Sequence, residues 1–236
     1  MFMNRLAPRL GAFLPHLRDA RSGVALIEFA YTLPAVMLMG MAGVETANLA
    51  QTHLRISQVA LMLADNASRA GVDTAGGTIQ QIREIDVLDM MQGVRLQASR
   101  LNLAENGRIT LSSLETNAEG GQWIHWQRCL GKKQGANWDS SYGTQGDGAS
   151  GTNFPGMGKS GSEVRAPEGE AVMFVEINYQ YKPLFPNWVI GTPTIQYTAS
   201  YIVRDKRDLA GPNNAGLYDP APSVANNKMT CDKYTT

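Results

Sequence analysis

The carboxylate of Glu28 is the side chain whose position in this sequence most strongly suggests a chemical role. Residues 24–44 form an apolar stretch in which Glu28 is the only charged residue. A carboxylate inside a membrane costs about 2.5–3.5 kcal/mol on insertion scales, so an acid at such a position is expected to serve a function. The alternative is that Glu28 lies close to the lipid headgroups and reaches water at little cost.

The stretch that holds Glu28 has the length of a membrane-spanning helix. At about 1.5 Å per residue its 21 residues extend roughly 30 Å, the thickness of the hydrocarbon layer. The preceding residues 1–23 carry four arginines and one aspartate, which predicts that the N-terminus stays in the cytoplasm. A secretory signal peptide is the alternative, but its apolar region is usually shorter and ends in an A-x-A-like cleavage site. We therefore expect a single pass, with the C-terminal part of the chain outside the cytoplasm.

The residues around Glu28 follow a specific pattern. Gly23 ends the basic leader, four apolar residues follow, and then come Glu28 and Phe29, with Pro34 six residues after the acid. This pattern resembles the processing site of the TadE-like family of minor pilins and pseudopilins, which belong to tight-adherence (Tad/Flp, type IVc) pilus systems. The resemblance covers about residues 21–48, and the rest of the chain matches only in general plan.

The resemblance implies a maturation step and a mode of assembly. A membrane-bound prepilin peptidase of this family would cut between Gly23 and Val24, and a glycine leaves the backbone open to the enzyme. The new α-amine of Val24 would then pair with Glu28 of a neighbouring subunit, because pairing offsets the cost of two charges in lipid. Pro34 is expected to kink or locally unwind the helix. The implied partners are inner-membrane lipid, the prepilin peptidase, other pilin or pseudopilin subunits and the Tad assembly machinery.

The remaining sequence predicts an α+β fold with three parts. Residues 1–23 form the leader, residues 24–70 a single transmembrane and stalk helix, and residues 71–236 a pilin-like extracytoplasmic head. In the head, residues 78–103 show apolar residues at helical spacing, with Gly93 as a possible break. Strands are then expected at residues 108–115, 122–130, 171–181 and 194–203, which suggests an antiparallel sheet.

A glycine-rich segment separates the second and third predicted strands. Residues 131–170 include 10 glycines, so we expect an exposed and mobile loop. Its acidic side chains offer oxygen ligands to a cation, but acids in a polar loop are more often simply solvated, and no metal site or cofactor is predicted. These side chains are Asp139, Asp147, Glu163, Glu168 and Glu170.

Cys129 and Cys231 are the only cysteines in the chain. Both fall on the predicted extracytoplasmic side of the membrane, where disulfides persist. A bridge between them would tie the C-terminal tail to the second strand and stabilise the fold by about 4–5 kcal/mol in the chain-entropy model. Two separate buried thiols are the alternative.

Other functional classes find little support in the sequence. The chain has 21 basic and 21 acidic residues, and this balance argues against a nucleic-acid-binding protein. Residues 146–151 match G-x-G-x-x-G, but no strand-turn-helix unit surrounds them. The three histidines are scattered and form no H-E-x-x-H or triad motif. We therefore expect a structural protein and no enzyme. The alternatives are a membrane-anchored pilus assembly factor that never enters the fibre, and a signal-anchored binding module or enzyme.

Overall fold

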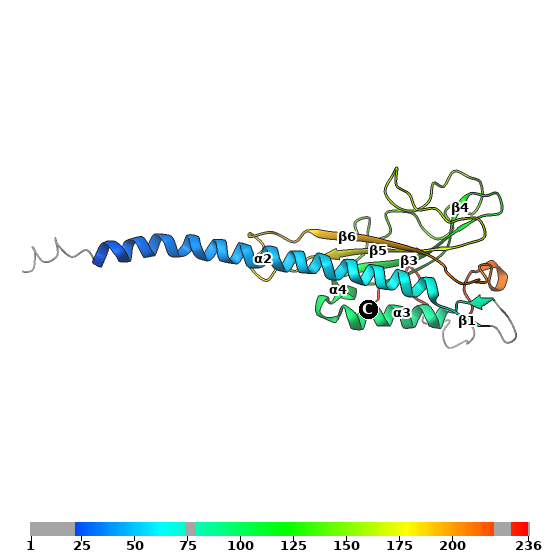
Figure 1. Cartoon of the computed structure of the whole chain (residues 1–236), viewed down its shortest axis with the longest axis horizontal. Helices are drawn as coiled ribbons and strands as arrows, with labels where there is room; N and C mark the ends of the chain where they lie inside the picture. The colour runs from blue at the N-terminus through cyan, green and yellow to red at the C-terminus, as the bar shows by residue number, and fades with distance from the viewer. Residues whose placement is uncertain (1–21, 74–78, 220–227, 236) are drawn as a thin grey trace, which may run out of the picture.

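One long helix projects from a head that combines a second helix with an antiparallel sheet (Figure 1). The computed structural model describes residues 22–73, 79–219 and 228–235. Most of the expected leader, part of the turn after the first helix and part of the C-terminal tail lie outside these residues. The α+β class and the long apolar N-terminal helix are confirmed.

The long helix α2 runs from Ser22 to Arg69 and contains 48 residues. Pro34 does not end it, so the expected local unwinding is not found. Proline removes a single backbone donor, and membrane helices tolerate that loss. At the other end of α2, the guanidinium of Arg207 donates hydrogen bonds to the carbonyls of Ala67, at 3.0 Å, and Ala70. These carbonyls would otherwise lack partners at the helix terminus.

The second helix is shorter than predicted. Helix α3 spans Glu84–Gln97 and is continuous through Gly93, and the 3₁₀-helix η1 (Ser99–Leu101) and helix α4 (Leu103–Asn106) follow it. The residues before α3 instead form β2 (Gln80–Gln81), which pairs with β1 (Val72–Asp73). The carboxylate of Asp86 accepts the backbone N–H of Arg83 at 2.9 Å, which sets the start of the helix.

The four predicted strands are confirmed and form one antiparallel sheet. They are β3 (Gly107–Thr116), β4 (Gln122–Leu130), β5 (Val172–Gln180) and β6 (Thr194–Ile202), in the order β4-β3-β5-β6. Strand β3 pairs with β4 on one side and with β5 on the other. Strands β3 and β4, like β5 and β6, are consecutive in the chain and neighbours in the sheet. The connection from β4 to β5, residues 131–171, instead crosses β3, which lies between them in the sheet.

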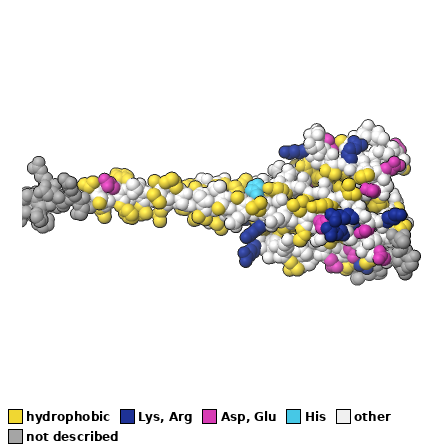
Figure 2. All heavy atoms as spheres, viewed as in Figure 1, with side chains coloured by type: hydrophobic (Ala, Val, Ile, Leu, Met, Phe, Trp, Pro, Cys, Tyr) yellow, Lys and Arg dark blue, Asp and Glu magenta, His cyan; other side chains and the backbone are white. Residues whose placement is uncertain are grey.

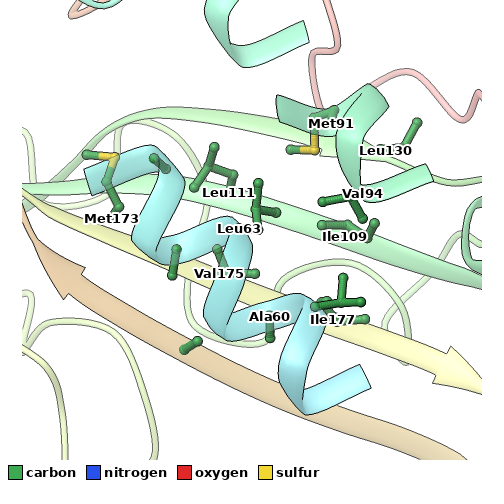
Figure 3. Packing of buried hydrophobic residues seen from close by; sticks show 14 of the residues in the cluster. Ala60, Leu63, Met91, Val94, Ile109, Leu111, Leu130, Met173, Val175 and Ile177 are labelled. Carbon is green, nitrogen blue, oxygen red and sulfur yellow. The ribbon is translucent and has the colours of Figure 1, made fainter. Parts of the chain in front are cut away.

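One face of the sheet packs against the C-terminal half of α2 and against α3 (Figure 3). Alternate residues of β5, such as Val175 and Ile177, point toward Leu63 of α2, and all three are fully buried. Met91 and Val94 of α3 are also fully buried against this face. The amphipathic half of α2 is therefore part of the core of the head.

The segment 131–170 covers the opposite face of the sheet. Met157 and Ala166 from this segment are buried with Phe174 of β5 and Leu114 of β3 in a second apolar cluster. Most other residues of the segment are exposed or half-buried. Isolated apolar residues between the glycines pack against this face of the sheet. Strands β3 and β5 are therefore buried on both faces.

Candidate functional site

The N-terminal half of α2 projects away from the head with its side chains uncovered. Every residue from Gly23 to Gly40 is exposed, and the projecting rod is largely hydrophobic in Figure 2. This helix is long and apolar enough to cross a membrane. Large apolar side chains with about half or more of their surface exposed include Val24, Leu26, Ile27, Phe29, Tyr31, Val36, Met37 and Met39. Surface of this kind is stable in lipid or against other apolar helices.

The residues of the predicted cleavage site are open to an approaching molecule. A Cβ atom added at Gly23 would meet no heavy atom within 4 Å, and Val24 is 56% exposed. Both residues lie in the first turn of α2. Nothing in the described head obstructs this end of the helix, which extends away from it (Figure 1).

The carboxylate of Glu28 is exposed one turn further along α2. Within residues 22–73, 79–219 and 228–235, no basic side chain forms an ion pair with it. The hydroxyl of Thr32 donates a hydrogen bond to the backbone carbonyl of Glu28 at 2.9 Å, not to its carboxylate. Phe29 is 60% exposed beside it, and Pro34 lies on the same exposed segment. The acid is therefore available to a cation from another molecule.

A second acid on α2, Glu45, is fully buried where the helix meets the head. Its carboxylate accepts the backbone N–H of Phe185 at 2.9 Å, that of Leu184 at 3.0 Å and the hydroxyl of Tyr181. Burial raises the pKa of this carboxyl, but the hydrogen bonds from Tyr181, Phe185 and Leu184 outweigh it and hold the pKa below its ordinary value. Glu45 thus joins the end of the apolar span to the β5–β6 loop.

Tyr181 is the partner of Glu45 in the head and is also buried. Burial, together with the hydrogen bond to Glu45, raises the pKa of Tyr181 to about 12. Its hydroxyl accepts a hydrogen bond from the side chain of Asn48 at 2.6 Å. Sequence reasoning missed this contact because Glu45 and Tyr181 are 136 residues apart in the chain.

The predicted disulfide between Cys129 and Cys231 is present. It fixes the C-terminal tail beside β4, next to the buried guanidinium of Arg108. Arg108 donates hydrogen bonds to the carbonyls of Gly131 and Lys233, both at 2.8 Å, and to that of Cys231 at 2.6 Å. The disulfide and the hydrogen bonds of Arg108 therefore hold the same C-terminal tail against β4.

The acids of the segment 131–170 form no metal site in the described residues, where no group of three or more potential ligands occurs. Asp147 accepts the backbone N–H of Thr144 at 2.7 Å, and Asp139 that of Gly135 at 2.9 Å. Glu163 accepts the N–H of a nearby glycine in the same way. These carboxylates stabilise turns.

His125 lies in a buried polar group that resembles a hydrolytic triad in composition only. Its Nδ1 is 2.8 Å from Oε2 of Glu115, and the hydroxyl of Ser113 donates a hydrogen bond to the other carboxylate oxygen, Oε1, at 2.6 Å. The other ring nitrogen, Nε2, faces the carbonyl of Asn214 at 2.9 Å and not a hydroxyl. Burial lowers the pKa of His125, but the contact with Glu115 outweighs it and raises the pKa above its ordinary value. This arrangement supports a structural ion pair.

Comparisons of the chain with family models, with curated proteins and with solved structures find no match.

Proposed function

We propose that this protein is a structural subunit, a TadE-like minor pilin or pseudopilin of a Tad-type pilus. Its site of action is the projecting half of α2. The proposal is carried by one observation, that Gly23 and Glu28 lie on the exposed apolar half of α2 with the spacing of a prepilin processing site. An anchored enzyme or binding module has no use for this combination of residues.

Processing after Gly23 makes the chain competent for assembly. A new α-amine on Val24 lies four residues before Glu28, about 6 Å away along the helix axis at about 1.5 Å per residue. Each subunit then carries one positive and one negative group inside the membrane. Pairing the amine of one subunit with Glu28 of its neighbour offsets the cost of both charges and sets the axial position of the two helices.

The head remains on the outer side of the inner membrane or in the fibre. The basic leader supports a cytoplasmic N-terminus, and the Cys129–Cys231 bond is typical of an oxidising compartment outside the cytoplasm. Because the C-terminal half of α2 is packed on the sheet, a force applied through the helix is transmitted directly to the head.

The experiment that tests the proposal separates processing from assembly. Glu28→Ala is expected to be cleaved normally but to disappear from sheared pilus or co-assembled pilin fractions, because the unpaired amine lacks its partner. Thr32→Ala, an exposed polar residue one turn away, is the matched control and should assemble normally. Normal co-assembly of cleaved Glu28→Ala would overturn the proposal.

The cleavage step has its own pair of variants. Gly23→Leu is expected to leave the leader attached, since a side chain there blocks the peptidase but meets no atom of the chain itself. Gly40→Leu adds the same side chain at an equally open position and should be cleaved. Equal cleavage of the two variants would contradict the assignment of Gly23.

A further inference from the structure

The loop between β5 and β6 carries an apolar surface that the fold of the head does not use. In residues 182–193 the only charged side chain is Lys182. Leu184 is 63% exposed and Trp188 is 68% exposed, although both are large apolar side chains. Pro186 is also exposed, and its carbonyl accepts the N–H of Val189 at 3.1 Å in a turn that presents Trp188.

The buried acid on α2 fixes this loop at one level along the helix. The backbone N–H groups of Leu184 and Phe185 bind the carboxylate of Glu45, and Tyr181 binds it from the base of the loop. Figure 1 shows the loop beside α2, at the end of the head from which the long helix projects. The apolar span ends at Val44, directly before Glu45.

The membrane thickness then determines what surrounds the loop. If residues 24–44 fill the roughly 30 Å of hydrocarbon, Glu45 lies at the boundary between hydrocarbon and headgroups. Leu184 is fixed at the same boundary, because the amide that Glu45 binds belongs to Leu184 itself, and Trp188 lies four residues further along the same loop. Tryptophan is enriched at such interfaces, and Lys182 can extend its ammonium group to lipid phosphates.

We propose that the β5–β6 loop is a second membrane contact, which inserts Leu184 and Trp188 into the outer interface of the bilayer. This inference rests on the single-pass anchor of the proposed function. The occupant of the surface is lipid, because the surroundings of a lone helix at this depth are lipid and because residues 182–193 carry no acid that would oppose anionic headgroups. The loop and α2 together hold the head at two points, which restricts its tilt before assembly.

The test uses a spin label on the full chain in vesicles of phosphatidylethanolamine and phosphatidylglycerol, at a low ratio of protein to lipid. Both native cysteines are in the disulfide, so Asn187→Cys introduces a single free thiol in the loop and keeps Leu184 and Trp188. Collision of the label with oxygen, which partitions into lipid, is compared with collision with a polar nickel complex. Ala118→Cys, in the turn at the far end of β3, is the aqueous control, and Met37→Cys in the apolar span is the lipid control.

The label at position 187 is expected to show an oxygen-to-nickel ratio several-fold above that at 118 and closer to that at 37. Adding Leu184→Ser and Trp188→Ser should return the ratio to that of the aqueous control. A ratio at 187 equal to that at 118, with 37 in lipid, would overturn this inference and leave the anchor intact. A label at 187 protected from both reagents would assign the loop to a protein contact and would also overturn it. If the label at position 37 showed the same oxygen-to-nickel ratio as the aqueous control, the proposed membrane span and this inference would both be contradicted.

Discussion

Removal of the disulfide tests how the head is stabilised on the outer side of the membrane. The change is the double substitution Cys129→Ala with Cys231→Ala, or reduction of the wild-type chain. The bridged residues are 102 positions apart, and the chain-entropy model gives about 4.7 kcal/mol for a loop of about 100 residues. The tail keeps the hydrogen bonds from Arg108 to the carbonyls of Cys231 and Lys233, so it remains docked in the native state.

We therefore expect the alanine pair to lose about 3–5 kcal/mol of unfolding free energy, the upper part of the range measured for native disulfides. For a domain of about 150–250 residues, this loss lowers the Tm by roughly 10 °C. The measurement is thermal unfolding of the detergent-solubilised chain, followed by near-ultraviolet circular dichroism. Reductant should lower the Tm of the wild type and leave that of the alanine pair unchanged. Equal midpoints for the oxidised wild type and the alanine pair would refute the reasoning.

Two further predictions concern buried charges in the head. Glu84→Ala should lower the free energy of unfolding by about 3–5 kcal/mol, because it removes the carboxylate that pairs with the buried guanidinium of Arg128. Glu105→Ala breaks an exposed pair and should lower it by less than about 1 kcal/mol in the same urea unfolding assay. Similar losses for the two variants would contradict this. Because the pKa of His125 is raised by Glu115, the ion pair should stabilise the head fully below pH 6.5 and lose its effect as the pH rises through the higher native pKa. A titration of His125 by nuclear magnetic resonance that gives a pKa at or below 6.5 would contradict this assignment.

The strands were predictable because their signal is local. β4 occupies Gln122–Leu130, the range expected from its aromatic and β-branched residues. β3 and β5 differ from their predicted ranges by one residue at each end, and β6 differs by one residue at its C-terminal end. The long helix was equally predictable, since the apolar span ends at Val44 and no glycine or proline interrupts the residues that follow as far as Arg69. In these elements, local preference and tertiary packing favour the same structure.

The start of α3 was not predictable from periodicity. Residues 78–83 have apolar residues at helical spacing, yet Gln80 and Gln81 form a strand with Val72 and Asp73. The backbone N–H of Gln80 also donates to the carbonyl of Lys206 at 2.8 Å. Such contacts between distant segments override a weak helical pattern.

The second apolar cluster and the contacts of Glu45 were missed for the same reason. Met157 and Phe154 stand alone among glycines, so no period reveals that they cover the second face of the sheet. Glu45 looks like the first polar residue after a membrane span, and its partner Tyr181 lies at the end of β5. By contrast, the spacing of Gly23 and Glu28 is a local pattern that can be seen in the sequence alone, and its role in processing stays a prediction.

The mass of the mature N-terminus tests the central claim most directly. The native protein should be purified from cells with an active prepilin peptidase and from matched cells without it, and its N-terminal peptide measured by mass spectrometry. We predict a chain that begins at Val24 in the first case and an uncleaved chain in the second. A chain that keeps its arginine-bearing leader in both would contradict the account and leave an ordinary membrane-tethered domain.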